Sequence, residues 1–211
     1  MSDVSQNKEE FLRIWKASSI PTCTGADALL EWLLASDFFE APASSRYHLA
    51  VPGGLCQHSL NVYRRLKHLL NTIYPESIPY ATQTIAIVSL LHDICKTNMY
   101  KETRRNQKTY DKEKVAKAEK DQIKHDSLGD YIWESVPSYE INEDFIFGHG
   151  EKSVYLINKF MKLTDEEAQA IRYHMSSWKH DDISSVGKVY EANHLAFLLH
   201  VADEMATYMD E

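Results

Sequence analysis

Residues 53–73 read GGLCQHSLNVYRRLKHLLNTI, and this stretch decides the fold class. Its apolar residues recur at the spacing of one helix face: Leu55, Val62, Leu66, Leu69 and Ile73. Two glycines precede them and two prolines follow, which sets limits for a helix at both ends. His58 lies on the same stripe. The pattern therefore predicts a long helix that carries an imidazole toward the protein interior.

Residues 80–96, YATQTIAIVSLLHDICK, predict a second buried helix. Ile85, Val88 and His92 stand at positions i, i+3 and i+7, so they share one helix face. Asp93 follows His92 directly. The sequence thus predicts an imidazole and a carboxylate at the end of a buried face, where an unsatisfied charge is costly.

Apolar periodicity predicts further helices before and after these two. They are expected around residues 11–15, at 27–37, at about 152–161, from a capping box at 164–167 onward, and at about 195–209. The helix after the capping box places Ile171 and His174 on one face, and the last helix carries Asp203 beside its apolar side. All of the histidines and aspartates named so far are therefore expected to lie on helices.

The segment between about 100 and 148 differs from the rest of the chain. Residues 101–130 hold nine Lys or Arg and seven Asp or Glu with few apolar side chains, which is typical of a solvated insertion. Residues 131–141 are rich in aromatic and β-branched side chains, and we expect them to pair with part of 106–111 as a short hairpin. These aromatic side chains either pack the hairpin on the bundle or stack on a base.

Length and composition indicate one domain. The 211 residues show no internal repeat and no Pro-rich or Gly/Ser-rich linker. We expect an all-α helical bundle over 1–211, with N-terminal helices in 1–45, a metal-binding core in 52–205, and the charged insertion with its hairpin in 101–141.

Charge and cysteine content argue against several classes of protein. The net charge of −8 disfavours stable binding of duplex nucleic acid, which normally requires a basic surface. The three cysteines form no CxxC pair, so neither a disulfide framework nor a cysteine zinc site is expected. No apolar run is long enough for a signal core or a membrane span, and we expect a cytoplasmic protein. The oligomeric state stays open.

Buried histidines and aspartates are most simply explained by a bound metal. A helical bundle can gather such residues from separate helices around one ion. The candidates in three predicted helices are His58, His92, Asp93 and Asp203. Mixed imidazole and carboxylate ligands suit a divalent transition metal such as Mn, Fe, Zn, Ni or Co rather than calcium.

The order of these residues resembles that in the HD superfamily of metal-dependent phosphohydrolases, where a lone His precedes an adjacent His-Asp pair and a distal Asp. The strings PGGLCQHSLNV and SLLHDICK are similar to local patterns of that family, and the resemblance covers about 52–205. It implies that one ion is held by His58, His92, Asp93 and Asp203.

Two more histidines extend the resemblance to members with two ions. His149 in FGHGE and His174 in IRYHM are similar to the pair that such members insert before the last Asp. The resemblance implies that these two hold the second ion and that Asp93 bridges both.

Lys96 completes an H-D-x-x-K pattern one helical turn beyond the histidine of the pair, and we assign it stabilisation of negative charge in the transition state. The resemblance implies hydrolysis of a phosphoester, in a nucleotide or another small phosphorylated metabolite, by a metal-activated water, with Asp93 and Lys96 as catalytic residues. The basic side chains of Lys101, Arg104 and Arg105 are expected to gather the phosphates of this anionic substrate.

Two other functions stay open. Related helical folds use the same His and Asp set for di-iron oxygenase chemistry, and a metal site can also bind a nucleotide as a non-catalytic sensor. Lys96 and the basic insertion favour hydrolysis. Cys95 stands where family members usually carry Gly, and apolar neighbours argue against a nucleophilic role for it. Other histidines, among them His48, match no motif and are expected in loops or at the surface.

Overall fold

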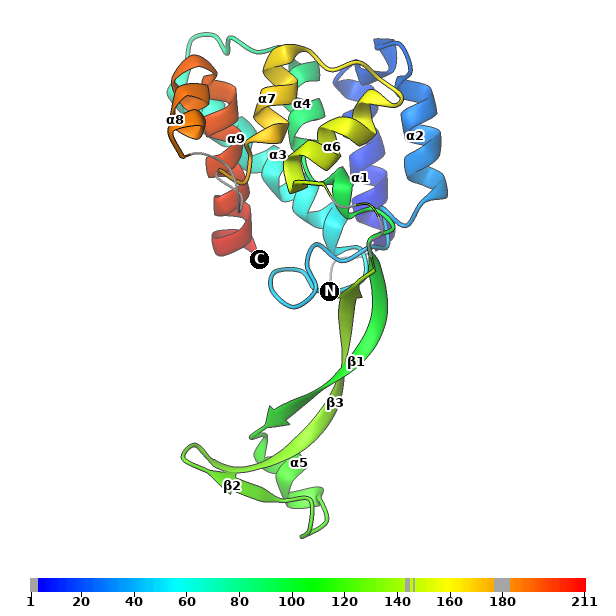
Figure 1. Ribbon diagram of the computed structural model, residues 1–211, viewed down its shortest axis with the longest axis vertical. Helices are drawn as coiled ribbons and strands as arrows, with labels where there is room; N and C mark the ends of the chain where they lie inside the picture. Colours follow the sequence, from blue (N-terminus) through cyan, green and yellow to red (C-terminus); the bar gives the residue numbers. More distant parts are fainter. Residues whose placement is uncertain (1–3, 143–144, 146, 177–182) are drawn as a thin grey trace.

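The computed structural model describes residues 4–142, 145, 147–176 and 183–211. They form a helical bundle from which a slender β-arm extends (Figure 1). The strands of the described residues all lie between Tyr100 and Ile141, in one antiparallel sheet of three strands. The prediction of a mostly helical fold with a β insertion in this segment is confirmed.

The bundle is built from helices whose positions largely follow the predicted ones. In chain order they are α1 (Val4–Ala17), α2 (Ala26–Ala35), α3 (Gly54–Ile73), α4 (Thr82–Leu91), α6 (His149–Asn158), α7 (Asp165–Arg172), α8 (Ile183–Ala192) and α9 (His194–Met205). Short 3-10 turns, η1 (Ile20–Thr22) and η2 (Ile94–Lys96), follow α1 and α4, and a π-helical turn, η3 (Ala206–Asp210), continues α9. No helix among the described residues is both long enough and apolar enough to cross a membrane.

The N-terminal helix adds an aromatic layer to the core. Phe11 in α1 is fully buried, and its ring centroid lies 5.3 Å from those of both Phe38 and Phe39 in edge-to-face contact. Trp15 stacks on Phe11 one helical turn further on, with the ring centroids 6.0 Å apart. The first helix is thus part of the bundle core, because its apolar stripe is covered by the loop that follows α2.

Helix α3 confirms the helix predicted from the opening stretch, and it contacts α1, α4 and α9. Gly53 precedes it at φ 76°, in the left-handed region that glycine adopts without strain. Most of the predicted stripe is buried. Ile73 is 49% exposed because it is the last residue of the helix, and Leu70 is buried in its place.

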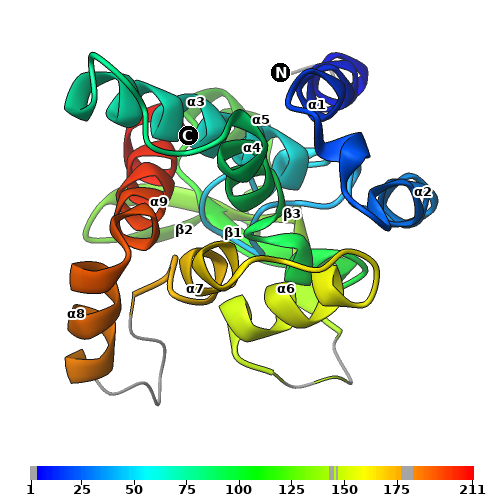
Figure 2. The ribbon, with the colours of Figure 1, turned by 90° about the horizontal axis from the view of Figure 1, so that it is seen from above.

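Helix α4 lies in the middle of the bundle, with α1, α3 and α7 around it (Figure 2). Residues 85–91 are all buried, as expected for a helix that is covered on every side. The helix ends just before His92, and Asp93 leaves the helical region at φ −105° and ψ 16°. The chain therefore turns at the point where two of the predicted ligands stand.

The predicted capping box starts α7. Thr164 Oγ1 accepts a hydrogen bond from Glu167 N at 3.2 Å, and Glu167 Oε2 accepts one from Thr164 N at 2.9 Å. Glu167 is buried, and its other oxygen accepts a hydrogen bond from the Thr84 hydroxyl at 2.8 Å. This bond ties α7 to α4 and so fixes where the residues after α7 lie.

The arm contains β1 (Tyr100–Thr109), α5 (Lys112–Lys117), β2 (Lys124–Asp126) and β3 (Gly129–Ile141), with the sheet order β1-β3-β2. The predicted pairing of 106–111 with the aromatic stretch is confirmed as far as Thr109, which lies opposite Ile132. The strands also continue back to Tyr100, so the hairpin is a long ribbon rather than a short one, and much of the charged run is strand or helix. The arm extends away from the bundle instead of packing on it (Figure 1).

We expect Phe11→Ala to lower the free energy of unfolding by about 3–5 kcal/mol, because removal of a fully buried ring leaves a cavity. Leu128→Ala, at the tip of the arm where the side chain is 79% exposed, should change it by at most about 0.5 kcal/mol. Urea unfolding followed by circular dichroism measures both. Equal destabilisation by the two substitutions would contradict the packing described for α1.

Candidate metal centre

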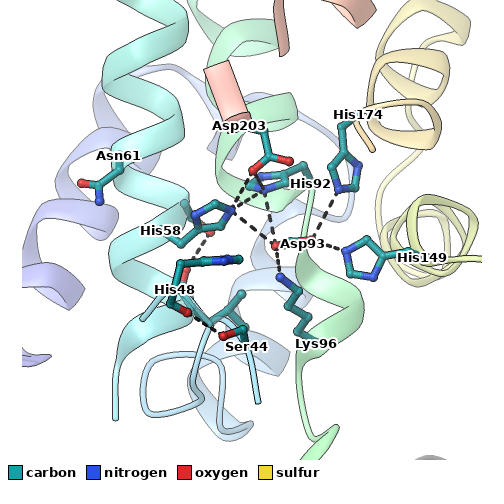
Figure 3. Close-up of polar contacts among 12 residues, drawn as sticks. Ser44, His48, His58, Asn61, His92, Asp93, Lys96, His149, His174 and Asp203 are labelled. Atoms are coloured by element: carbon teal, nitrogen blue, oxygen red, sulfur yellow. Dashed lines mark hydrogen bonds and ion pairs between the residues drawn. The ribbon is translucent and has the colours of Figure 1, made fainter. Parts of the chain in front are cut away.

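The six predicted ligands come together where helices of the bundle meet (Figure 3). They are His58 in α3, His92 and Asp93 after α4, His149 at the start of α6, His174 just after α7, and Asp203 in α9. All are buried except His149, whose side chain is 14% exposed. Four of them stand at helix ends, which differs from the prediction that helices carry them all.

Four of these side chains turn nitrogen or oxygen atoms toward one point. His58 Nε2 lies 3.0 Å from Asp203 Oδ1 and 3.2 Å from His92 Nε2. Asp93 Oδ2 lies 3.6 Å from both imidazole nitrogens. Ligand atoms that share one divalent metal at about 2.0–2.2 Å stand roughly 3–3.5 Å from one another. The spacing of His58, His92 and Asp203 fits a single ion, and these three buried groups could hold one. Asp93 stands beside them and also belongs to a buried group with His92 and His174 that could hold an ion.

Hydrogen bonds on the far side of two rings set their tautomers. His92 Nδ1 lies 2.8 Å from the carbonyl oxygen of Ser89, and His174 Nδ1 lies 2.7 Å from that of Ile171. A carbonyl oxygen only accepts, so both Nδ1 atoms donate, and in the neutral rings Nε2 is an acceptor that faces the centre. His174 Nε2 is buried without a hydrogen-bond partner among the described residues. A metal ligand would account for this buried acceptor.

Asp93 connects the first four side chains with the other two histidines. Its Oδ1 lies 2.6 Å from His149 Nε2 and 3.5 Å from His174 Nε2. Its Oδ2 faces His58 and His92 instead. The two oxygens thus face two separate pairs of imidazoles, as expected of a carboxylate between two ions. Two groups that each could hold an ion contain Asp93: one with His92 and His174, and one with Cys95 and His149.

Lys96 brings a positive charge to the same carboxylate. Its Nζ lies 2.6 Å from Asp93 Oδ2, and the residue is only 9% exposed. Burial lowers the pKa of Lys96, but the attraction of Asp93 outweighs burial and raises this pKa above its ordinary value. The ammonium is therefore charged at neutral pH and stands beside the centre.

His58 is held by carboxylates on both sides. Burial lowers the pKa of His58, but hydrogen bonds to Asp203 and Glu211 outweigh burial and raise it to about 9. Burial raises the pKa of Asp203, and its contact with His58 outweighs burial, so this pKa falls well below its ordinary value. His58 and Asp203 therefore form a charged pair at neutral pH.

The other histidines differ in protonation. Burial lowers the pKa of His149, while Cys95 and Asp93 outweigh burial and raise it to about 10. Burial is the main reason why the pKa of His92 falls to about 4. His92 is thus neutral and able to bind a metal, whereas His149, like His58, must first lose a proton.

The centre opens into a pocket of about 550 Å³. The described residues that line it are Tyr47, His48, His58, Asp93, Lys96, Met175, Asp203, Glu204, Thr207, Tyr208 and Glu211. One part of this lining belongs to the candidate centre, and the rest comes mainly from the loop before α3 and from α9 and η3. A small molecule in the pocket would therefore meet the candidate ligands and Lys96 together.

His48 lies beside the predicted site although no motif marks it. It is in a loop, as expected, but its ring centroid lies 5.0 Å from that of His58 and its Nε2 is buried. Burial, and after it the charge of His58, lowers the pKa of His48. A loop has no periodicity that would place such a residue from the sequence.

Glu211 is a second residue that the sequence prediction missed. Its carboxylate accepts from His58 Nδ1 at 3.0 Å and from Asn61 Nδ2 at 3.0 Å. Asn61 follows His58 by one turn of α3, so the two side chains lie on the same face of the helix and can bind the same carboxylate. This spacing in the string HSLN is the local feature of the sequence that could have indicated such a partner. The contact holds the ring of His58 with Nε2 toward the centre.

Lys101, Arg104 and Arg105, which are predicted to bind substrate, stand on β1, and the described lining of the pocket contains none of them. Arg104 donates to the carbonyl oxygen of Ser135 at 2.6 Å and to its hydroxyl at 3.0 Å. The structure brings Lys96 to the centre but not these three residues. Their contact with a substrate stays a prediction.

No family model, no curated protein and no solved structure matches this chain. The resemblance to the HD superfamily therefore stays a prediction, and function has to be inferred from the contacts of the site.

We expect metal binding to release protons. An ion that binds at His58 and a second ion that binds at His149 each displace a proton at pH 7.5. The affinity for metal should therefore rise with pH until these groups, with pKa values of about 9 and 10, are deprotonated. Calorimetric titration with MnCl₂ in two buffers of different ionisation enthalpy measures the release, which should be about one proton per ion. His125→Ala, which changes an exposed histidine on the arm, should leave it unaltered. No release at all would contradict the role of His58 as a ligand.

We also expect Glu211→Ala to weaken Mn binding by about 10–100-fold, because a carboxylate that accepts from a ligand imidazole fixes the ring and raises its basicity. Glu211→Gln keeps an acceptor without the charge and should have a smaller effect. Glu204→Ala removes a carboxylate that lines the same pocket and is the matched control in calorimetry. Equal losses in both alanine variants would mean that overall charge, not the bond to His58, sets the affinity.

Proposed function

We propose that this chain is a metal-dependent phosphohydrolase of the HD superfamily, which cleaves a phosphoester in a nucleotide or another small phosphorylated metabolite. One observation carries the proposal: Asp93 faces two pairs of histidines, and the same carboxylate holds the buried ammonium of Lys96 at 2.6 Å. A set of metal ligands alone would suit several chemistries. A fixed ammonium beside them suits a substrate that develops negative charge at a phosphoryl group.

The first ion would be held by His58, His92, Asp93 and Asp203, whose ligand atoms contact one another, and the second by Asp93, His149 and His174. Divalent transition metals bound there would supply a water of lowered pKa as nucleophile and would neutralise charge on the phosphoryl oxygens. Lys96 directs its ammonium at a phosphoryl oxygen, and Asp93 keeps that ammonium charged and oriented. The protein provides no nucleophile in this scheme.

The proposal includes a small anionic substrate and a cytosolic location, as expected from the sequence. The volume of the pocket, about 550 Å³, is in the range of sites for small ligands and cofactors. A pocket of this volume suits a nucleotide better than duplex nucleic acid.

Protein loaded with Mn, Co or Ni should hydrolyse p-nitrophenyl phosphate or a nucleotide. Asp93→Ala should abolish the reaction, because it removes a ligand to both ions and the partner of Lys96. Lys96→Ala should lower kcat by about 10²–10³-fold and keep the metal content, as measured by phosphate release and metal analysis. Lys114→Ala, which removes an ammonium paired with Glu134 on the arm, is the control and should retain activity.

Hydrolysis that persists in the Asp93→Ala variant would contradict the proposal. Oxygen uptake by iron-loaded protein without phosphate release would favour a di-iron oxygenase, which could use the same histidines and aspartates. Binding of a nucleotide without turnover under any tested metal would favour a sensing module.

A further inference from the structure

Two tyrosines stand at the pocket that leads to the candidate centre. Tyr47, in the loop before α3, is 83% exposed, and Tyr208, in η3, is 80% exposed, yet both line the pocket. Aromatic side chains usually bury most of their surface in a folded protein. Two of them left uncovered at one opening offer a contact surface for a ligand with a flat apolar part.

The backbone holds Tyr47 in place although its side chain is exposed. Tyr47 N donates to Ser44 Oγ at 2.9 Å, and this hydroxyl donates to the carbonyl oxygen of His48 at 2.7 Å. Ala43 N donates to the carbonyl oxygen of Leu49 at 3.1 Å and closes the loop. The loop thus presents the ring from a fixed backbone, which reduces the entropy that binding would cost.

The turn that carries Tyr208 is anchored as well. Arg65 in α3 donates through Nε to Asp210 Oδ2 at 2.7 Å. Glu211 accepts from His58 at 3.0 Å. Tyr208 stands two residues before Asp210 in the same turn, so its backbone is held against α3 while the residue lines the pocket.

The charges of the pocket limit how many phosphates a ligand can carry. Lys96 is the one lysine or arginine in the described lining, whereas Glu204 and Glu211 add negative charge beyond the candidate metal ligands. A phosphate at the centre would lie beside Lys96. A second or third phosphate that extends past the ions and Lys96 would meet the carboxylates of the pocket, and like charges placed together weaken binding.

We propose that Tyr47 and Tyr208 form a ring-binding subsite, and that the ligand is a planar aromatic group joined to a single phosphate, as in a nucleoside monophosphate. The inference rests on the proposed function, because it takes the phosphate to lie at the metal centre. Stacking tolerates different bases, since every base has a π-face. The pocket then selects for a ring and one phosphate rather than for a particular base.

Kinetics with two matched phosphomonoesters test the subsite. Adenosine 5′-monophosphate and ribose 5-phosphate share the sugar phosphate, and only the first has a ring to stack. With Mn-loaded protein we expect kcat/KM for adenosine 5′-monophosphate to be higher by roughly 5- to 150-fold, the range that one stacked base contributes. Tyr47→Ala and Tyr208→Ala should raise KM for this compound and leave ribose 5-phosphate unchanged. Tyr47→Phe and Tyr208→Phe should keep KM low.

Tyr155→Ala changes an exposed tyrosine of α6 outside this pocket and is the control. Equal kcat/KM for the two compounds, or equal losses for both in the alanine variants, would overturn the subsite and leave the phosphohydrolase proposal intact. Faster turnover of adenosine 5′-triphosphate than of the monophosphate would overturn the limit to one phosphate.

If neither compound is hydrolysed, the subsite is still decided by calorimetric binding to the Mn-loaded protein, and the proposed function is judged separately by p-nitrophenyl phosphate and other nucleotides. Tighter binding of adenosine 5′-monophosphate than of ribose 5-phosphate, lost in Tyr47→Ala and Tyr208→Ala, supports the subsite. Equal binding of the two compounds overturns it.

Discussion

The arrangement of the site depends on the carboxylate of Asp93, which the candidate histidines and Lys96 approach from different elements. A buried ion that lacks a partner costs several kcal/mol, and Asp93 is only 2% exposed. Burial raises its pKa, but the charges around it, that of Lys96 first, outweigh burial and hold the pKa well below the ordinary value. Lys96 and His149 each approach one carboxylate oxygen to 2.6 Å. Lys96 belongs to η2 and His149 to α6. The negative charge of Asp93 is therefore balanced only when these two elements are packed together.

The remaining histidines depend on contacts further from the centre. The bond from Thr84 to Glu167 ties α7 to α4, and His200 Nδ1 of α9 donates to the carbonyl oxygen of His174 at 2.7 Å. His174 therefore reaches Asp93 from a segment that two neighbouring helices hold in place. The packing of the bundle thus positions these ligands, and this suits a centre whose ligands must keep fixed separations.

Features with a simple periodicity could be predicted from the sequence. His58 and His92 lie on apolar stripes of period 3.6, and the capping box at Thr164 has a fixed spacing. The arm could be predicted only in part, because β1 carries charged residues on successive positions and lacks the alternation that marks a half-buried strand. Its register depends on pairs such as Arg104 with Pro137, which a single strand does not reveal. His48 and Glu211 reach His58 through tertiary packing alone.

The candidate ligands are widely spread along the chain, from His58 in α3 to Asp203 in α9. During translation, which adds about 5–20 residues per second, the earlier helices emerge well before α9. A nascent chain that ends just before α9 holds the four candidate histidines and Asp93, but it lacks Asp203 and the contact of Asp203 with His58. For a chain that binds metal as proposed, the final choice among competing ions therefore falls after synthesis of α9. That choice then reflects the free concentrations of metals in the cell as much as the geometry of the ligands.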